Sequence, residues 1–155
     1  MMKEENKCRI QRAKRTIIRI VVHCSATKEG QSFRKADIDR WHNDKGWNGC
    51  GYHYVIGLDG KIELGRYIED KGAHAGAYNT GSIGICYIGG LDKDGEAKDT
   101  RTPEQKDALL WLLTEMHRLY PGAQLMGHRD LPGVKKACPC FDVRCEYYDK
   151  IPFTR

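Results

Sequence analysis

An almost unbroken run of β-branched residues, 16-TIIRIVVH-23, ends on a histidine. Its composition predicts a buried strand. A second apolar run, 82-SIGICYIGG-90, predicts a central strand of the same sheet. Because strand ends are where a rigid scaffold meets open loops, His23 occupies a place that often carries ligands or catalytic groups.

The rest of the chain alternates helical and strand patterns. The elements expected are a short helix over 32–46 capped by Ser32, a hairpin over 51–66, a long helix within 102–122, a strand over 123–128 and a short helix over 141–150. Thr102 and Gln105 form a capping box in front of the long helix, and Pro103 suits its first position. The hairpin turns at Asp59 and Gly60. This order predicts a single-domain α/β fold, with a mixed central β-sheet flanked by helices.

The size and composition of the chain indicate one soluble globular domain. A length of 155 residues is enough to bury a core without disulfides or metal. Hydrophobic residues make up 40% and charged residues 30%, a balance typical of globular proteins. We expect a basic and flexible N-terminal arm over 1–15, followed by one domain over 16–155.

Charge and hydropathy argue against several classes of partner. The net charge is +5, and much of the excess lies in the first 20 residues. Beyond them basic and acidic residues are mixed, so we expect no nucleic-acid partner. No apolar run reaches the roughly 18 to 20 residues of a spanning helix, which argues against membrane insertion. The short apolar run near the N-terminus contains Arg19 and does not suit a signal peptide, so we expect cytoplasmic synthesis. We also expect the protein to be a monomer.

Cysteine is frequent in this chain. The seven cysteines are Cys8, Cys24, Cys50, Cys86, Cys138, Cys140 and Cys145. Their odd number and irregular spacing, without a signal peptide, favour reduced thiols over a disulfide framework and leave metal binding open to some of them. A single local bridge stays possible on these grounds.

Two histidines follow predicted strands, and this pattern raises the question of a metal site. Zinc accepts imidazole nitrogen and thiolate sulfur, and His23, His128 and one cysteine of 137-ACPCF-141 would supply a catalytic set with an open position. A structural site made of His128, Cys138, Cys140 and Cys145 is the rival, although it lacks the usual paired C-x2-C spacing. Residue types alone leave a catalytic zinc, a structural zinc and no metal as alternatives.

Four stretches of the chain together resemble one family. They are 21-VVHCSAT-27, 46-GWNGCGYHYVIGLDGKIELGR-66, 72-GAHAGAYNTGSIGICYIGG-90 and 127-GHRDLPGVKKACPCFD-142. In this order they resemble the zinc-dependent N-acetylmuramoyl-L-alanine amidases of the type 2 family, which are related to peptidoglycan recognition proteins. The resemblance is closest to the small phage lysozymes, or endolysins, of that family.

The resemblance implies a site and an activity. It implies one zinc ion per chain in a surface cleft, with His23, His128 and Cys138 as ligands, and Tyr52 and Lys136 assisting catalysis. The substrate would be peptidoglycan, cut at the amide bond between N-acetylmuramic acid and L-alanine. Such an enzyme would be made in the cytoplasm and reach the cell wall on release. The alternative is a peptidoglycan-binding module without catalysis, although the cysteine ligand that such modules typically replace is present here.

The remaining candidates have competing interpretations. The resemblance places His74 at the rim of the cleft as a substrate-binding residue. Alternation along a strand predicts that Tyr52 and Tyr54 share one sheet face and that His53 is a structural histidine on the other. His42, on a predicted helix among charged neighbours, is expected at the surface. Lys135 is the rival of Lys136, and Cys140 could replace Cys138 as ligand, pair with Cys145 or stay a free thiol.

Overall fold

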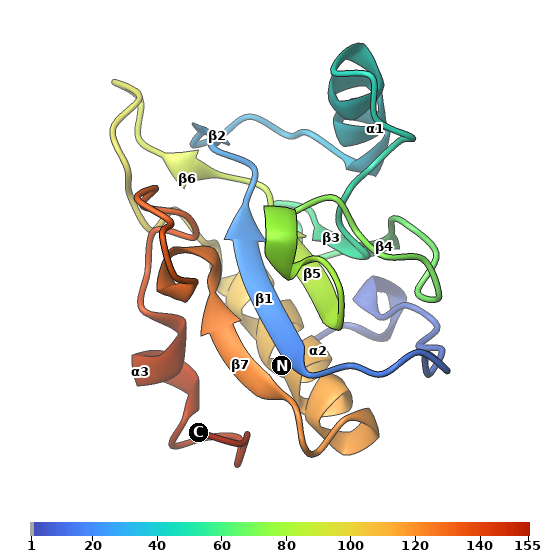
Figure 1. Ribbon diagram of the computed structural model, residues 1–155. Coiled ribbons are helices and arrows are strands. Elements are labelled where there is room, and N and C mark those ends of the chain that lie inside the picture. The colour runs from blue at the N-terminus through green and yellow to red at the C-terminus, as the bar shows by residue number, and fades with distance from the viewer. Residues whose placement is uncertain (1) are drawn as a thin grey trace.

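The computed structural model describes residues 2–155 and contains a central mixed sheet (Figure 1). The five strands of this sheet lie in the order β4-β3-β5-β1-β7 and comprise Ile62–Leu64, Tyr54–Ile56, Ser82–Tyr87, Arg19–Cys24 and Gln124–Gly127, respectively. β3 and β4 form the predicted antiparallel hairpin, and the other neighbouring strands are parallel. The predicted α/β fold class is therefore confirmed. A small parallel pair, β2 (Thr27–Lys28) with β6 (Gly90–Leu91), was not expected from the sequence.

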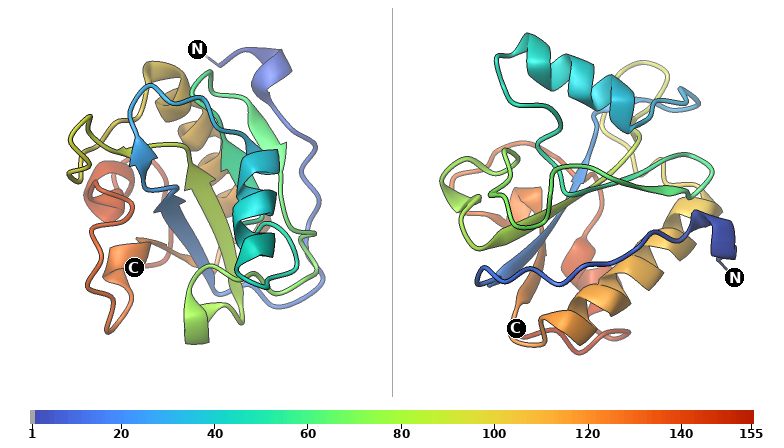
Figure 2. Two further views of the ribbon diagram at one scale, coloured as in Figure 1. Left: turned by 90° about the horizontal axis from the view of Figure 1, so that it is seen from above. Right: turned by 90° about the vertical axis from the view of Figure 1, so that its right-hand side faces the viewer.

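Helices cover both faces of the sheet. The helices are α1 (Lys35–Asp44), α2 (Pro103–Leu119) and α3 (Val143–Tyr147), with short 3-10 turns η1 (Glu4–Asn6), η2 (Gly76–Tyr78) and η3 (His128–Asp130). Figure 2 shows α1 and α2 on opposite sides of the sheet. Along β1, Ile20 and Val22 pack into the core cluster that contains α2, whereas Val21 belongs to a cluster on the other face. His23 follows the alternation of Val21, so it lies on the face away from α2.

The two longer helices begin differently from one another. Thr102 accepts a hydrogen bond from the Gln105 N–H, and the Gln105 side chain accepts one from the Thr102 N–H, which confirms the predicted capping box. The predicted cap of α1, Ser32, is wrong: the cap is Arg34, whose N–H donates to the Asp37 carboxylate at 2.8 Å. The carboxylate three residues into the helix satisfies this backbone donor, so no hydroxyl is needed at the cap.

The N-terminal segment lies beside α2 and the loop that follows β4. The Ala13 N–H donates to the Tyr120 hydroxyl at 2.7 Å, and the Lys14 N–H donates to the Glu69 carboxylate. The Arg15 guanidinium donates to the carbonyls of Ile68 and Ser82. Mobility of this arm in solution stays a prediction. Within the described residues, every helix is too short or too polar to span a bilayer.

Candidate active site

The two histidines predicted to follow strands come together at one edge of the sheet. β1 and β7 are parallel neighbours with Val22 opposite Gly127, so His23 and His128 each stand one step beyond this pair. Their ring centroids are 4.5 Å apart. Parallel pairing thus joins two residues more than a hundred positions apart in the chain.

Cys138 completes the cluster from the loop after η3. Its Sγ lies 3.9 Å from His23 Nδ1, and the ligand atoms of His23, His128 and Cys138 all lie within 4.8 Å of one another. The Cys24 N–H donates to the Cys138 sulfur at 3.2 Å, which holds this sulfur beside the end of β1. Two imidazoles and one thiolate at these separations match the ligand set and the compact geometry of a catalytic zinc site.

His74 holds the outer nitrogen of His23. The His23 Nδ1 faces Cys138, whereas its Nε2 lies 2.8 Å from His74 Nδ1. Burial lowers the pKa of His23 well below its ordinary value and that of His74 to about 3, so both rings are neutral near pH 7. If Nδ1 of His23 is the ligand, its Nε2–H donates to His74, the kind of outer contact that fixes ring orientation in metal sites.

Tyr52 lies against the cluster, with its ring centroid 5.1 Å from that of His23. Burial raises the pKa of its phenol well above the ordinary value, so Tyr52 is a proton donor at neutral pH. The prediction that Tyr52 and Tyr54 share a sheet face is wrong. Tyr54 packs with the α2 cluster and Tyr52 with the α1 cluster, because β3 begins only at Tyr54 and strand alternation does not extend back to Tyr52.

Glycine at position 51 allows Tyr52 and His74 to approach one another. The Ala73 N–H donates to the Gly51 carbonyl at 3.0 Å, and a Cβ at position 51 would collide with the Ala73 carbonyl. Only glycine permits two backbones to pass this closely. The segment containing Tyr52 is thereby fixed beside the segment containing His74.

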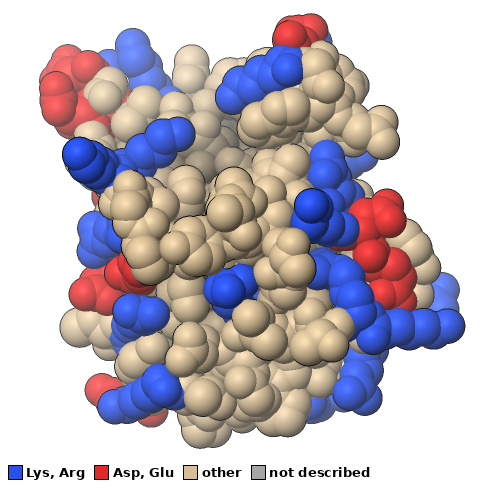
Figure 3. Space-filling model, in the orientation of Figure 1, with Lys and Arg blue, Asp and Glu red and all other residues tan. Residues whose placement is uncertain are grey.

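A cavity of about 600 Å³ opens over the cluster. Its lining includes His23, His128 and Cys138, together with Tyr52 and His74. Figure 3 shows the molecule hollowed between α1 and the side that carries β2 and β6, with lysine and arginine side chains on both sides of the hollow. A cluster of possible metal ligands at the base of an open cavity is accessible to a polymeric substrate from outside.

Lys136 is an exposed cation in the lining of this cavity, as is Lys45. Among the described residues that line the cavity is Lys136 but not Lys135. Burial is the main cause that lowers the pKa of His128, and the charge of Lys136 lowers it further. An ammonium in this position can stabilise negative charge that develops in the cavity.

Comparison with known proteins identifies the family of this chain. The family described as N-acetylmuramoyl-L-alanine amidase matches residues 13–141. The chain belongs to this family. The resemblance seen in the sequence motifs is thus confirmed, and the protein is an amidase that hydrolyses the bond between N-acetylmuramic acid and L-alanine in peptidoglycan.

Relatives of this amidase include phage enzymes. The endolysin of Klebsiella phage KP32 is 43% identical over 125 residues, which cover 81% of this chain and 82% of the relative. The endolysin N-acetylmuramoyl-L-alanine amidase LysCS from Clostridium intestinale URNW has a similar structure, with a TM-score of 0.76, 25% identity and 99% of each chain covered. Wild-type PGRP-LB from Drosophila has a TM-score of 0.73 and 27% identity, with 93% of this chain and 86% of that chain covered.

Two groups near the amidase site differ from the expectations. His42 is buried rather than at the surface: its Nδ1 accepts a hydrogen bond from the Gly51 N–H at 2.8 Å, and its ring packs against Trp47. The signal was the spacing, since His42 lies four residues after the buried Ile38 and therefore on the same helix face. Cys140 faces Cys24, with the sulfurs 3.9 Å apart, a contact that was not among the expected ones.

Proposed function

We propose that this amidase is a zinc-dependent enzyme of the endolysin type, with one zinc ion held by His23, His128 and Cys138. The observation that carries the proposal is the convergence of these three ligand atoms within 4.8 Å at the base of an open cavity. The neutral state of the two imidazoles, favoured by burial, is the state that binds metal. The target is the peptidoglycan of a bacterial cell wall, which the enzyme would reach after cytoplasmic synthesis and release.

Zinc bound there supplies Lewis-acid polarisation of the scissile carbonyl and a water of lowered pKa. The protein's own groups act on the charge that develops on the carbonyl oxygen. Tyr52 keeps its phenolic proton at neutral pH and can donate a hydrogen bond to that oxygen. Lys136 supplies a positive charge at the mouth of the cavity. Each such contact is worth roughly 3 kcal/mol of transition-state stabilisation.

His74 has two roles in the proposed function. Its place in the lining of the cavity supports the substrate contact inferred from the sequence. Its hydrogen bond with His23 Nε2 supports a second role, which is to hold the His23 ring so that Nδ1 faces Cys138. The two roles can be tested separately, because loss of the substrate contact changes the Michaelis constant, whereas loss of the His23 contact changes the affinity for metal.

The proposal is tested on purified peptidoglycan with wild type, Cys138→Ala and a chelated wild-type sample. We expect wild type to release new L-alanine amino termini without new reducing sugars. Both treatments should abolish the release, and added zinc should restore it in the chelated wild type only. Binding of the wall without release in every sample would contradict the proposal and indicate a recognition module.

The neighbouring lysines give a matched pair for the same assay. Lys136→Ala should lower kcat/KM by roughly 10²-fold, because one stabilising contact to the developing oxyanion is lost. Lys135→Ala removes the same charge from the same loop, outside the cavity lining, and should leave kcat/KM unchanged. Equal losses in the two variants would show that only the overall charge of the loop matters.

A further inference from the structure

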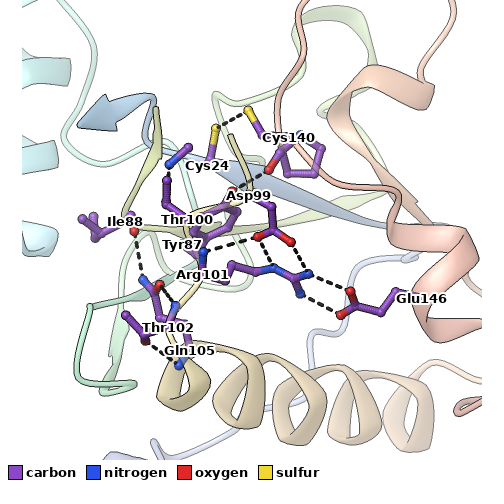
Figure 4. A network of polar contacts seen from close by, with 12 residues as sticks. Cys24, Tyr87, Ile88, Asp99, Thr100, Arg101, Thr102, Gln105, Cys140 and Glu146 are labelled. Atoms are coloured by element: carbon purple, nitrogen blue, oxygen red, sulfur yellow. Dashed lines mark hydrogen bonds and ion pairs between the residues drawn. The ribbon is translucent and has the colours of Figure 1, made fainter. Parts of the chain in front are cut away.

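Two thiols from distant parts of the chain meet beside the ligand cluster. Cys24 is the last residue of β1, and Cys140 lies in the loop that carries Cys138. Their sulfurs are 3.9 Å apart and point toward one another (Figure 4). Cys145, the partner considered from the sequence, lies instead on α3 as an exposed thiol.

One residue, Tyr87, holds both thiols in place. In the sheet, Tyr87 of β5 is the register partner of Cys24. Its hydroxyl donates to the Pro139 carbonyl at 2.6 Å, directly before Cys140 (Figure 4). The Cys140 N–H also donates to the Ala137 carbonyl at 2.8 Å, which closes the turn. The two sulfurs therefore face one another because their backbones are anchored to the same residue, Cys24 beside the Tyr87 backbone and the Cys140 turn at the Tyr87 hydroxyl.

A glycine leaves room for the pair. A Cβ at Gly90 would lie 2.5 Å from the Cys24 sulfur and 3.7 Å from the Cys140 sulfur. Any other residue at position 90 would push the Cys24 sulfur out of its place. Gly90 also has φ 104°, a conformation that side chains disfavour, so both demands are met by glycine.

We propose that Cys24 and Cys140 are a reversible dithiol–disulfide pair, oxidised by a low-molecular-weight disulfide such as oxidised glutathione. Cys140, the more accessible of the two thiols, loses its proton, attacks one sulfur of the small disulfide, forms a mixed disulfide and releases one small thiol. Cys24 then attacks the Cys140 sulfur and releases the second small thiol. Two protein thiols and one small disulfide give one protein disulfide and two small thiols. The sulfurs must close from 3.9 Å to the bonded distance of about 2.05 Å, which requires side-chain rotation and a small loop shift.

The bridge would act on the ligand loop. Cys24 directly follows His23, and Cys140 lies two residues after Cys138, so the bond would tie the strand end to the loop next to two of the ligands. It would also close a loop that includes most of the chain, the case in which a cross-link restricts the unfolded state most. On the proposed function, an amidase made in a reducing cytoplasm and acting on the wall would gain this bond on release.

The test uses peptide mapping of the full-length protein, loaded with zinc and exposed to oxidised glutathione. Free thiols are alkylated, and the unreduced protein is digested and analysed by mass spectrometry. We expect one cross-linked peptide pair containing Cys24 and Cys140 in wild type and in Cys145→Ser, and its absence from Cys140→Ser. Oxidation should raise Tm by about 5 to 15 °C in wild type and Cys145→Ser, reversibly with a dithiol reductant, and not in Cys140→Ser.

Three results would overturn the proposal. The first is glutathione retained on Cys140 while Cys24 is still alkylated. The second is a bridge between Cys24 and Cys138, and the third is a Cys24–Cys140 bridge that leaves Tm unchanged. None of these measurements depends on hydrolysis of peptidoglycan, so a failure here is distinguishable from a failure of the proposed function.

Discussion

The cluster around Arg101 and the cluster around His23 are both buried and polar, but they differ in how completely their polar groups are paired. The Arg101 side chain is 0% exposed, and every guanidinium nitrogen donates to an acceptor. The acceptors include the carboxylates of Asp99 and Glu146 (Figure 4). The hydroxyl of Tyr147 is a further acceptor. The guanidinium carbon lies 3.4 Å from the ring centroid of Phe141. This cluster is complete without any ligand.

The histidine cluster is incomplete by comparison. His74 Nε2 is buried without a hydrogen-bond partner among the described residues. The ring centroids of His23 and His128 lie 4.5 Å apart with the rings tilted by 43°, and both groups have lowered pKa values, mainly through burial. Buried polar atoms are nearly always paired, so the unpaired His74 Nε2 in the lining of a cavity fits a site that binds a ligand. The two clusters therefore differ in hydrogen bonding: every guanidinium nitrogen of Arg101 has a partner, whereas one nitrogen of His74 has none among the described residues.

Removal of the Arg101 guanidinium, all of whose nitrogens donate hydrogen bonds, should give the largest effect on stability. Arg101→Met leaves the carboxylates of Asp99 and Glu146 near one another without their shared cation, and we expect a loss of about 3 to 5 kcal/mol in the free energy of unfolding. Urea denaturation measures this loss. The specific activity of the folded fraction should stay at the wild-type level.

Arg118→Met is the matched control for Arg101→Met. Arg118 pairs with Glu115 at 2.7 Å on the surface of α2, where its side chain is 64% exposed. A pair of this kind contributes at most about 1 kcal/mol. Equal losses of stability in the two variants would mean that saturation of the Arg101 cluster carries no special weight, and the comparison between the clusters would fail.

A smaller effect, on the affinity for zinc, is expected when the hydrogen-bond partner of His23 Nε2 is removed. His74→Ala removes the partner of His23 Nε2 and should weaken zinc binding by about 10- to 100-fold, measured by competition with a chromophoric chelator. His74→Gln keeps an acceptor for the His23 N–H and should recover part of the affinity. His117→Ala, whose ring packs against Phe153 away from the cluster, is the control. Unchanged zinc affinity with a raised Michaelis constant would leave His74 with the substrate contact alone.

The sequence predicted the histidine cluster around His23 better than the cluster around Arg101. His23 and His128 could each be placed at the end of a strand because an apolar run precedes each of them, and the structure shows that the two strands are neighbours. Cys138 and Tyr52 came from the family resemblance, and the alternation argument about Tyr52 failed because the chain there is bent rather than extended. Site residues lie next to regular elements, and regular elements have periodic signals.

Nothing in the sequence indicated the Arg101 cluster or the Cys24–Cys140 contact. Arg101 precedes α2 in a polar stretch, and its partner Glu146 lies 45 positions away on α3. Cys140 and Cys24 are likewise joined only through the way the loop after β7 folds back over β5. Contacts of this kind depend on loop geometry, which has no period in the sequence, so only the folded chain shows them.

The smallest effect on stability is expected at His53. This histidine lies beside the His23 cluster, but both of its ring nitrogens have hydrogen-bond partners, as in the Arg101 cluster. Its Nδ1 accepts from the Gly84 N–H at 3.1 Å, and its Nε2–H donates to the Asp70 carbonyl at 2.8 Å. Burial lowers its pKa to about 4 from 6.5, the ordinary value that it regains on unfolding. Below pH 6.5 the unfolded chain therefore binds a proton that the folded chain refuses, and stability falls as the pH decreases toward 4. The slope from this group approaches about 1.4 kcal/mol per pH unit.

His53→Gln, compared with wild type by urea denaturation across this pH range, should show a shallower fall in the free energy of unfolding even if it is less stable at neutral pH. Parallel curves would mean that His53 takes up its proton in the folded state as readily as in the unfolded state, and that its two hydrogen bonds do not keep the ring neutral.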